Sequence, residues 1–143
     1  MKKIPSVKSV MTAFPYWIDV EEDVETARKF MDEHRVRHLP VKENGKLVGV
    51  ISERDINRKL LALGQLQQTR LRVRDVCVMK AYVVGIDEPL DNVLVNMAMD
   101  HIGSAIIVKG ERLAGMFTLS DACRAFADDL RDRFRPLNGN DAA

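Results

Sequence analysis

The sequence lacks most of the features that mark metalloproteins, disulfide-rich secreted domains and membrane proteins. It has only two cysteines, Cys77 and Cys123, with no CxxC spacing, and three histidines without metal-ligand spacing. No apolar run approaches the roughly 18–20 residues that cross a bilayer, and no apolar segment follows the N-terminal lysines to form a signal peptide. We therefore expect a cytoplasmic protein without a metal site, with both cysteines reduced and in the core.

The charge balance is equally uninformative about polyanionic partners. The 143 residues include 22 Lys and Arg against 21 Asp and Glu, a net charge of +1. This mixture predicts no nucleic-acid-binding surface, and we expect neither a nucleic-acid nor a membrane partner. Hydrophobic residues make up 46% of the chain, enough for a real core, in one compact domain or in two small lobes that share it.

The chain does contain an internal repeat at a constant offset of 66 residues. The segment 49–55, Gly-Val-Ile-Ser-Glu-Arg-Asp, lies over the segment 115–121, Gly-Met-Phe-Thr-Leu-Ser-Asp. Two copies predict a pseudo-symmetric pair with matching clefts along the seam between them. We place an N-terminal tail at 1–6, the first motif at 7–60, a connector at 61–72, the second motif at 73–127, and the end of a C-terminal helix with a frayed tail at 128–143.

Each repeat shows the same pattern of strands and helices. Branched and aromatic runs predict strands at 16–20, 39–41, 47–51, 82–86, 105–108 and 113–117. Acidic residues at 21–23 and 87–88 begin segments of helical periodicity, and a second helix closes each repeat at 53–63 and 119–130. Asn44-Gly45 is a strong hairpin signal because both residues tolerate positive φ. The fold class is therefore mixed α/β (α+β), with the order β-α-β-β-α twice.

The candidate chemistry lies where the last strand of each repeat meets its last helix. Ser52-x-x-Asp55 and Thr118-x-x-Asp121 both open a helix, where free backbone N–H groups bind phosphate readily. A hydroxyl there can donate to a phosphate, and an Asp one turn later can accept from two adjacent ribose hydroxyls. The alternative is that both are capping boxes with no further role.

The surrounding residues resemble a known family. Ser9-Val10-Met11-Thr12, Arg37-His38-Leu39-Pro40-Val41 and the run from Gly45 to Ile56 follow, in order and spacing, the pattern of cystathionine-β-synthase (CBS) motifs. Residues 7–127 resemble a tandem pair of these motifs, called a Bateman module. The second half is a looser match, with Ile106 at the place of Pro40 and Ala114 at that of Val48.

The resemblance implies two pseudo-symmetric β-α-β-β-α CBS motifs packed through their sheets, with two clefts between them that bind adenosine-containing ligands. Carried over to this chain, it implies that Asp55 with Ser52 serves one cleft, and Asp121 with Thr118 and Ser120 the other. The first strand of the opposite motif usually completes each cleft. Tyr82 is therefore expected beside Asp55, and Thr12 with Tyr16 beside Asp121.

A difference between the repeats predicts that the clefts differ in their affinity for phosphate. The first repeat has Arg37-His38 where the second has Gly103-Ser104. We assign Arg37 and His38 to the Asp55 cleft, Ser104 to the other, and Arg54 as a further ligand contact, since an Arg fork fits phosphate well. The Asp55 cleft should then prefer the more anionic ligand. The alternative is that these residues form a solvated helix end, where cations favour the helix dipole.

The sequence thus favours a stand-alone regulatory or sensor module that binds AMP, ATP, an NAD-type dinucleotide or S-adenosylmethionine without catalysis, with no obligatory cofactor. The alternative is a dimerisation or partner-binding module with degenerate clefts. A third hypothesis, a nucleotide hydrolase using His38 as a base, is expected to fail for lack of turnover. We also expect a homodimer formed by stacking of the paired motifs, and a protein target whose identity is open.

Overall fold

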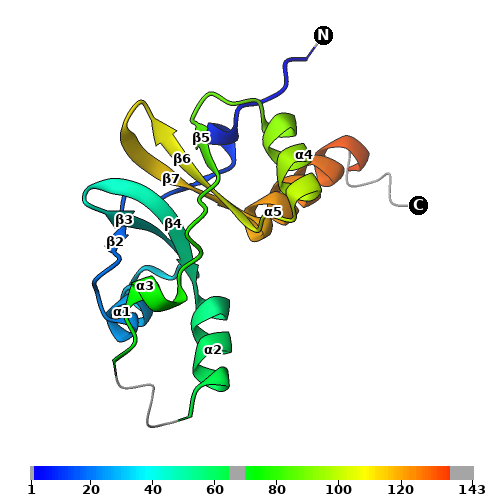
Figure 1. Ribbon diagram of the computed structural model, residues 1–143. Helices are drawn as coiled ribbons and strands as arrows, with labels where there is room; N and C mark the ends of the chain where they lie inside the picture. The colour runs from blue at the N-terminus through cyan, green and yellow to red at the C-terminus, as the bar shows by residue number, and fades with distance from the viewer. Residues whose placement is uncertain (1, 65–69, 136–143) are drawn as a thin grey trace.

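The structure is a computed structural model that describes residues 2–64 and 70–135. Residues 65–69 of the predicted connector and residues 136–143 of the predicted tail lie outside this part. The chain folds into two similar halves whose sheets lie side by side, with α1 and α2 covering one half and α4 and α5 the other (Figure 1). The mixed α/β fold predicted from the repeat is confirmed.

The elements follow the same order in both halves. The first half contains a 3₁₀ turn η1 (Val7–Ser9), β1 (Thr12–Ala13), β2 (Ile18–Asp19), α1 (Val24–His34), β3 (His38–Glu43), β4 (Lys46–Ser52) and α2 (Glu53–Ala62). The second contains α3 (Val73–Val76), β5 (Val83–Gly85), α4 (Leu90–Asp100), β6 (Ser104–Lys109), β7 (Arg112–Thr118) and α5 (Leu119–Phe134). Within the described residues no helix combines the length and the apolar character needed to cross a membrane.

The two predicted hairpins form as expected. Strands β3 and β4 pair antiparallel around Asn44 and Gly45, whose φ angles of 52° and 78° are the positive values that this tight turn requires. Strands β6 and β7 repeat the arrangement with Gly110 at φ 63°. Strands β2 and β5 add in parallel to β3 and β6, because a helix connects each to its neighbour.

The first residues of each repeat cross to the opposite half, which the repeat alone did not predict. Strand β1 pairs antiparallel with β7, with Thr12 opposite Met116, while Val78 bridges Val50 at the same offset of 66 residues. The sheets are therefore β1-β7-β6-β5 and β2-β3-β4, and the larger one contains strands of both repeats. Each crossing segment therefore belongs to one repeat by sequence but pairs with the sheet of the other half.

Backbone hydrogen bonds hold the crossing segments in place symmetrically. The Val7 amide donates to the Glu88 carbonyl at 2.9 Å, and the Val73 amide donates to the Glu22 carbonyl at 2.8 Å. Arg74 adds ion pairs with Glu21, at 2.6 Å, and with Glu43. Since all of these bonds join residues of different repeats, neither half has a complete backbone network alone.

Apolar side chains of the crossing segments are buried in the opposite half in the same way. Val7 is fully buried among Val93 and Phe117 of the second half, and Val73 is fully buried among Leu39 and Ile56 of the first. Each of these valines removes apolar surface from water in the half to which it does not belong by sequence, an effect worth about 1.5–3 kcal/mol per side chain. Separating the halves would expose both.

A third cluster joins the two sheets. Val50 from β4 packs on Ile106 from β6 and Met116 from β7, and all three are at most 9% exposed. Pro40 and Ile106 occupy equivalent positions on strands that alternate between an outer face and this shared face. The predicted packing of the two motifs through their sheets is confirmed.

Some predictions about the local structure were wrong. The strands predicted at 16–20 and 82–86 form only at Ile18–Asp19 and Val83–Gly85, because Tyr16 and Tyr82 precede the parallel pairing. The cysteines are not core residues. Cys77 is half-buried in the crossing segment after α3, and Cys123 is exposed on α5, where its position on the helix faces away from the sheet.

We predict that the crossing depends on two glycines. A Cβ at Gly49 would overlap the carbonyl oxygen of Val78, and a Cβ at Gly115 would overlap that of Thr12. Each change to Ala should lower the free energy of unfolding by about 1–3 kcal/mol, the usual cost of overpacking. Chemical denaturation measures this.

Gly85→Ala is the matched control, because nothing lies within 4 Å of a Cβ at that strand position. Equal stabilities for Gly49→Ala, Gly115→Ala and Gly85→Ala would show that the segments do not need the close approach.

Candidate functional site

The predicted helix caps are present in both halves. The Ser52 hydroxyl accepts from the Asp55 amide at 3.1 Å and donates to the Asp55 carboxylate at 2.8 Å. Thr118 and Asp121 form a full capping box, in which the Thr118 amide also donates to the carboxylate at 2.9 Å. The hydroxyls thus have the structural role that the sequence offered as the alternative. This role leaves the helix N-terminus facing the seam between the halves.

Asp121 is nearly buried, with 5% of its surface exposed, and is held from both repeats. The Thr12 hydroxyl, on the crossing strand β1, donates to Oδ1 at 3.0 Å. Arg124, one turn further along α5, donates to the same oxygen at 3.3 Å. The Thr118 contacts converge on Oδ2. A carboxylate fixed in this way presents acceptor atoms at a defined place on the wall of the seam.

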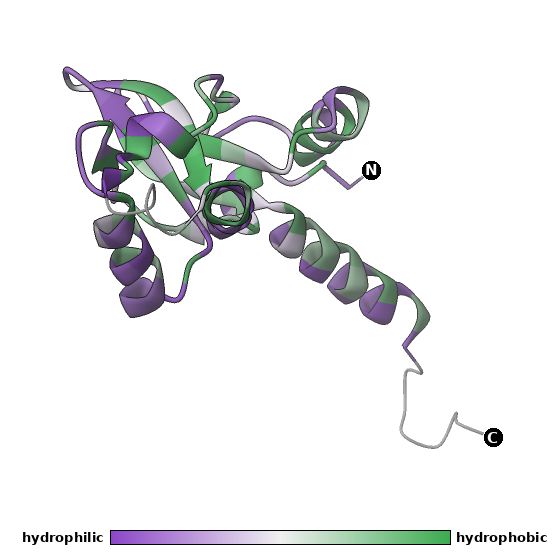
Figure 2. Ribbon diagram, turned by 60° about the horizontal axis from the view of Figure 1, so that its bottom comes forward, coloured by the Kyte–Doolittle hydropathy of each residue, from purple (hydrophilic) through white to green (hydrophobic). Residues whose placement is uncertain are grey.

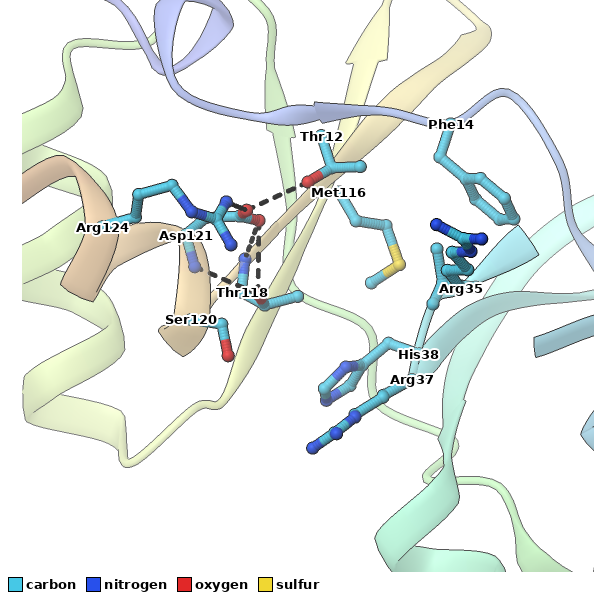
Figure 3. A pocket seen from close by; sticks show the side chains of 11 residues that line it. Thr12, Phe14, Arg35, Arg37, His38, Met116, Thr118, Ser120, Asp121 and Arg124 are labelled. Carbon is cyan, nitrogen blue, oxygen red and sulfur yellow. Dashed lines mark hydrogen bonds and ion pairs between the residues drawn. The ribbon is translucent and has the colours of Figure 1, made fainter. Parts of the chain in front are cut away.

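A cleft of about 270 Å³ opens in front of Asp121 (Figure 3). Its walls come from the crossing strand, the segment before β3, the end of β7 and the start of α5. Three kinds of group line it: apolar, hydroxyl or carboxylate, and cationic. The lining residues are Thr12, Phe14, Arg35, Val36, Arg37, His38, Met116, Thr118, Ser120, Asp121 and Arg124. The volume lies just below the range of about 300–1,000 Å³ typical of small-molecule sites.

Arg37 and His38 line the cleft of Asp121, whereas the sequence analysis assigned them to that of Asp55. The physical reason is the alternation of side chains along β3. His38 shares a strand face with Pro40, which is the face packed against the second half, while Leu39 points into the first core. The difference between the repeats therefore places a guanidinium and an imidazole in the Asp121 cleft, while the Asp55 carboxylate also acts on His38.

His38 contributes little fixed charge to this cleft. Burial lowers the pKa of its imidazole below 6.5, against the opposing effect of the Asp55 and Asp121 carboxylates, with Arg54 and Arg37 lowering it further. The neutral ring is then a hydrogen-bonding group at pH 7. The positive charge of the cleft comes from the guanidinium groups of Arg35, Arg37 and Arg124, opposed by the carboxylate of Asp121 and by that of Glu53, which lies 3.7 Å from Arg37.

Asp55 lies in a different environment. It is half-buried, and in the described part of the chain its hydrogen bonds come from Ser52 alone. Val78 stands where the other half has Thr12, so no hydroxyl reaches Asp55 from the crossing segment. Arg58, equivalent to Arg124, forms no ion pair with Asp55 among the described residues.

The remaining predicted site residues lie at various distances from this chemistry. Tyr16 stacks with Phe14 and His34 on α1, and among the described residues Phe14 rather than Tyr16 lines the Asp121 cleft. The Tyr82 hydroxyl accepts from Asn96 on α4. Ser104 is buried at the start of β6, opposite Thr118, and Arg54 lies in the first turn of α2, exposed and close enough to influence His38.

Sequence reasoning missed five residues that line the cleft, Phe14, Arg35, Val36, Met116 and Arg124. A signal for Arg124 existed, since an Arg three residues after a capping Asp lies on the same helix face. Arg35 had no such signal: it ends α1 in the left-handed conformation, φ 55°, where Gly is the usual residue. Within the described residues, no group of three or more His, Cys, Asp or Glu side chains could hold a metal ion.

Solved structures and known proteins are similar to this chain in fold and in sequence. The CBS domain pair of protein MJ0100, solved in complex with 5′-methylthioadenosine and S-adenosyl-L-methionine, matches with a TM-score of 0.75 and 27% identity, over 89% of this chain and 99% of that one. The CBS domain-containing protein YhcV of Bacillus subtilis is 29% identical over 116 residues, 81% of both chains.

An L-aspartate semialdehyde sulfurtransferase of Methanocaldococcus jannaschii is 30% identical over 125 residues, which is 86% of this chain. The chain spans only 23% of that protein, and 34% of a zinc metalloprotease from the same organism. These matches therefore concern one part of each larger protein.

The family model described as CBS domain matches residues 7–62 and again residues 73–128, which together are most of the chain. The two matched segments are the two halves of the fold, each with its capped helix and its aspartate, Asp55 or Asp121. The chain therefore belongs to the CBS domain family and carries a CBS domain pair.

Proposed function

We propose that the chain is a regulatory module that binds an adenine nucleotide in the Asp121 cleft without chemical conversion. One observation carries this proposal: a nearly buried carboxylate and three guanidinium groups line the same cleft, and they come from both repeats. Ribose hydroxyls would donate to Asp121, and a phosphate would lie beside Arg35 and Arg37. Phe14 and Met116 offer apolar surface for an adenine ring.

The solved relative at 27% identity supports an adenosine-type ligand, because its bound molecules both contain adenosine. Its ligands are a thioether and a sulfonium cation, whereas the three arginines here favour an anion, so AMP, ADP or ATP fits this cleft better. The cleft volume favours a mononucleotide over an NAD-type dinucleotide.

A module without catalysis is favoured over a hydrolase. Among the described hydrogen bonds, no nucleophile is paired with His38. The lowered pKa of His38 suits a neutral hydrogen-bond donor as well as a general base. The alternative, a partner-binding module with degenerate clefts, is favoured only if Asp121 caps its helix and does nothing else. Nucleotide binding without turnover separates the three hypotheses.

We predict that Asp121→Asn weakens AMP binding. The amide keeps the size of the side chain but loses a charged acceptor, a loss of about 1.5–3 kcal/mol, or roughly tenfold to a hundredfold in the dissociation constant. Calorimetric titration measures it. Asp128→Asn, an exposed site on the same helix, carries the same change in charge and should leave the affinity unchanged. Equal affinities for the two variants would remove Asp121 from the site.

We predict that Arg35→Gly separates stability from binding. Glycine relieves the left-handed strain of the helix end, so the free energy of unfolding should rise by roughly 1 kcal/mol. Loss of the guanidinium should weaken AMP binding by roughly tenfold and leave adenosine binding unchanged.

His101→Gly is the matched control, because His101 is the equivalent of Arg35 in the second repeat and ends α4 with the same φ of 55°. It should stabilise the fold by a similar amount without changing AMP affinity at the Asp121 cleft. If Arg35→Gly leaves AMP affinity intact, Arg35 is only a helix end.

We also propose that the module is a homodimer. Apolar side chains are exposed along the outer faces of α4 and α5, including Met99, Phe126 and Phe134, at 74%, 63% and 78%. Figure 2 shows α5 extending away from the sheets, so that the described part of the chain leaves its far end uncovered. Large exposed apolar patches mark association surfaces.

We predict a sedimentation mass of two chains at micromolar concentration. Phe126→Glu combined with Phe134→Glu should shift the mass to that of one chain, because charge on a buried apolar interface is costly. Glu substitutions at the exposed Asp128 and Asp132 provide the control, since they keep the charge. A wild-type mass near one chain would contradict the homodimer.

A further inference from the structure

The carboxylate of Asp121 has no free acceptor position before any ligand arrives. Oδ1 accepts from Thr12 at 3.0 Å and from Arg124 at 3.3 Å, and Oδ2 accepts from the Thr118 amide and hydroxyl at 2.9 and 3.2 Å. An ionised carboxylate offers about four lone-pair positions. A ribose hydroxyl can therefore reach Asp121 only if one of these partners leaves.

Arg124 is the partner that can leave most easily. Thr118 caps α5 with its contacts, and Thr12 lies on the crossing strand, paired with Met116 in the sheet. The Arg124 side chain is 69% exposed, and its bond to Oδ1 is the longer of the two at that oxygen. The pair is open to solvent on its Arg124 side only, so water can replace the bond that the guanidinium gives up. Its long stem also lets the guanidinium move without any backbone change.

The matching cleft has no such competitor. At the offset of 66 residues, Arg58 stands in place of Arg124 and Val78 in place of Thr12. No ion pair between Arg58 and Asp55 exists among the described residues, and Asp55 keeps only its bonds with Ser52. Among the described residues, the fully occupied carboxylate is thus particular to Asp121 and is not shared by its equivalent, Asp55.

We infer that Arg124 occupies the ribose position on Asp121 in the empty cleft and, once displaced, pairs with a phosphate of the ligand. A nucleotide phosphate restores to Arg124 the anion that it loses, whereas uncharged adenosine leaves it unpaired. Arg124 is therefore a specificity-determining residue that restricts this cleft to phosphate-bearing ligands. The inference rests on the proposed function, since it takes Asp121 as the ribose acceptor.

Figure 3 shows the geometry that permits this exchange. Arg124 and Asp121 lie on one wall of the cleft, and Arg37 and His38 lie on the opposite wall. A ligand with its ribose on Asp121 would lie between these walls. The Arg124 head group would remain beside it, at the edge of the cleft, because Arg124 is one turn from Asp121 on the same helix.

The test is calorimetric titration of Arg124→Gln with AMP and with adenosine, in a chain that also carries Asp55→Ala so that only the Asp121 cleft is observed. We expect AMP to bind about tenfold more weakly, because a charge-assisted contact is lost. Adenosine should bind about twofold to fivefold more tightly, because its competitor is gone. Arg58→Gln in the same background is the matched control and should change neither affinity.

A purely structural role of Arg124 cannot weaken the binding of AMP and at the same time strengthen the binding of adenosine. Weakening of both by the same factor, or no change in either, would overturn the inference, and tightening of both would show that Arg124 never holds the phosphate. Arg124→Lys should retain most of the preference for AMP, and thermal melts confirm that each variant is folded. If AMP binds the parent chain but Arg124→Gln behaves as the parent does, only this inference fails. If neither ligand binds the parent chain, the proposed function fails with it.

Discussion

Each half of this molecule is completed by the first residues of the other half. Val7 and Val73 are buried in the opposite cores, and their amides donate to Glu88 and Glu22 across the junction. The exchange is possible only where a strand has no Cβ to block the crossing backbone, at Gly49 and Gly115. The motif glycines are therefore a packing requirement that sets the position of everything near them.

The site follows from this exchange. Because β1 crosses to β7, the Thr12 hydroxyl reaches Asp121 of the second repeat, and because β3 begins at the seam, Arg37 and His38 line the opposite wall of the same cleft. A cleft lined by both repeats is stable only while they are packed together. The surroundings of Asp55 and Asp121 differ through single substitutions at equal offset, such as Val78 for Thr12, so the two carboxylates have different hydrogen-bond partners.

The repeat and the hairpins could be predicted because they depend on local signals, such as Asn44-Gly45 and the periodicity of apolar residues. The caps could be predicted for the same reason. The repeat alone did not predict the crossing strand, since two residues of pairing leave almost no pattern and their partner lies about a hundred residues away. Only the family resemblance placed Thr12 beside Asp121, where the two form a hydrogen bond. The assignment of Arg37 and His38 to the Asp55 cleft rested on their sharing its repeat, but both line the Asp121 cleft, and the Asp55 carboxylate still acts on the pKa of His38. Which cleft a side chain lines depends on how the strand is oriented at the seam, and only the packed structure defines the seam.

The central claim is that the cleft formed by both repeats binds a nucleotide by its ribose at Asp121 and by its phosphate at the arginines. A crystal structure of the chain with AMP tests it most directly. The account predicts ribose hydroxyls within hydrogen-bonding distance of the Asp121 carboxylate and the phosphate beside Arg35, Arg37 or Arg124. A nucleotide bound elsewhere, or an empty Asp121 cleft at saturating AMP, would contradict it.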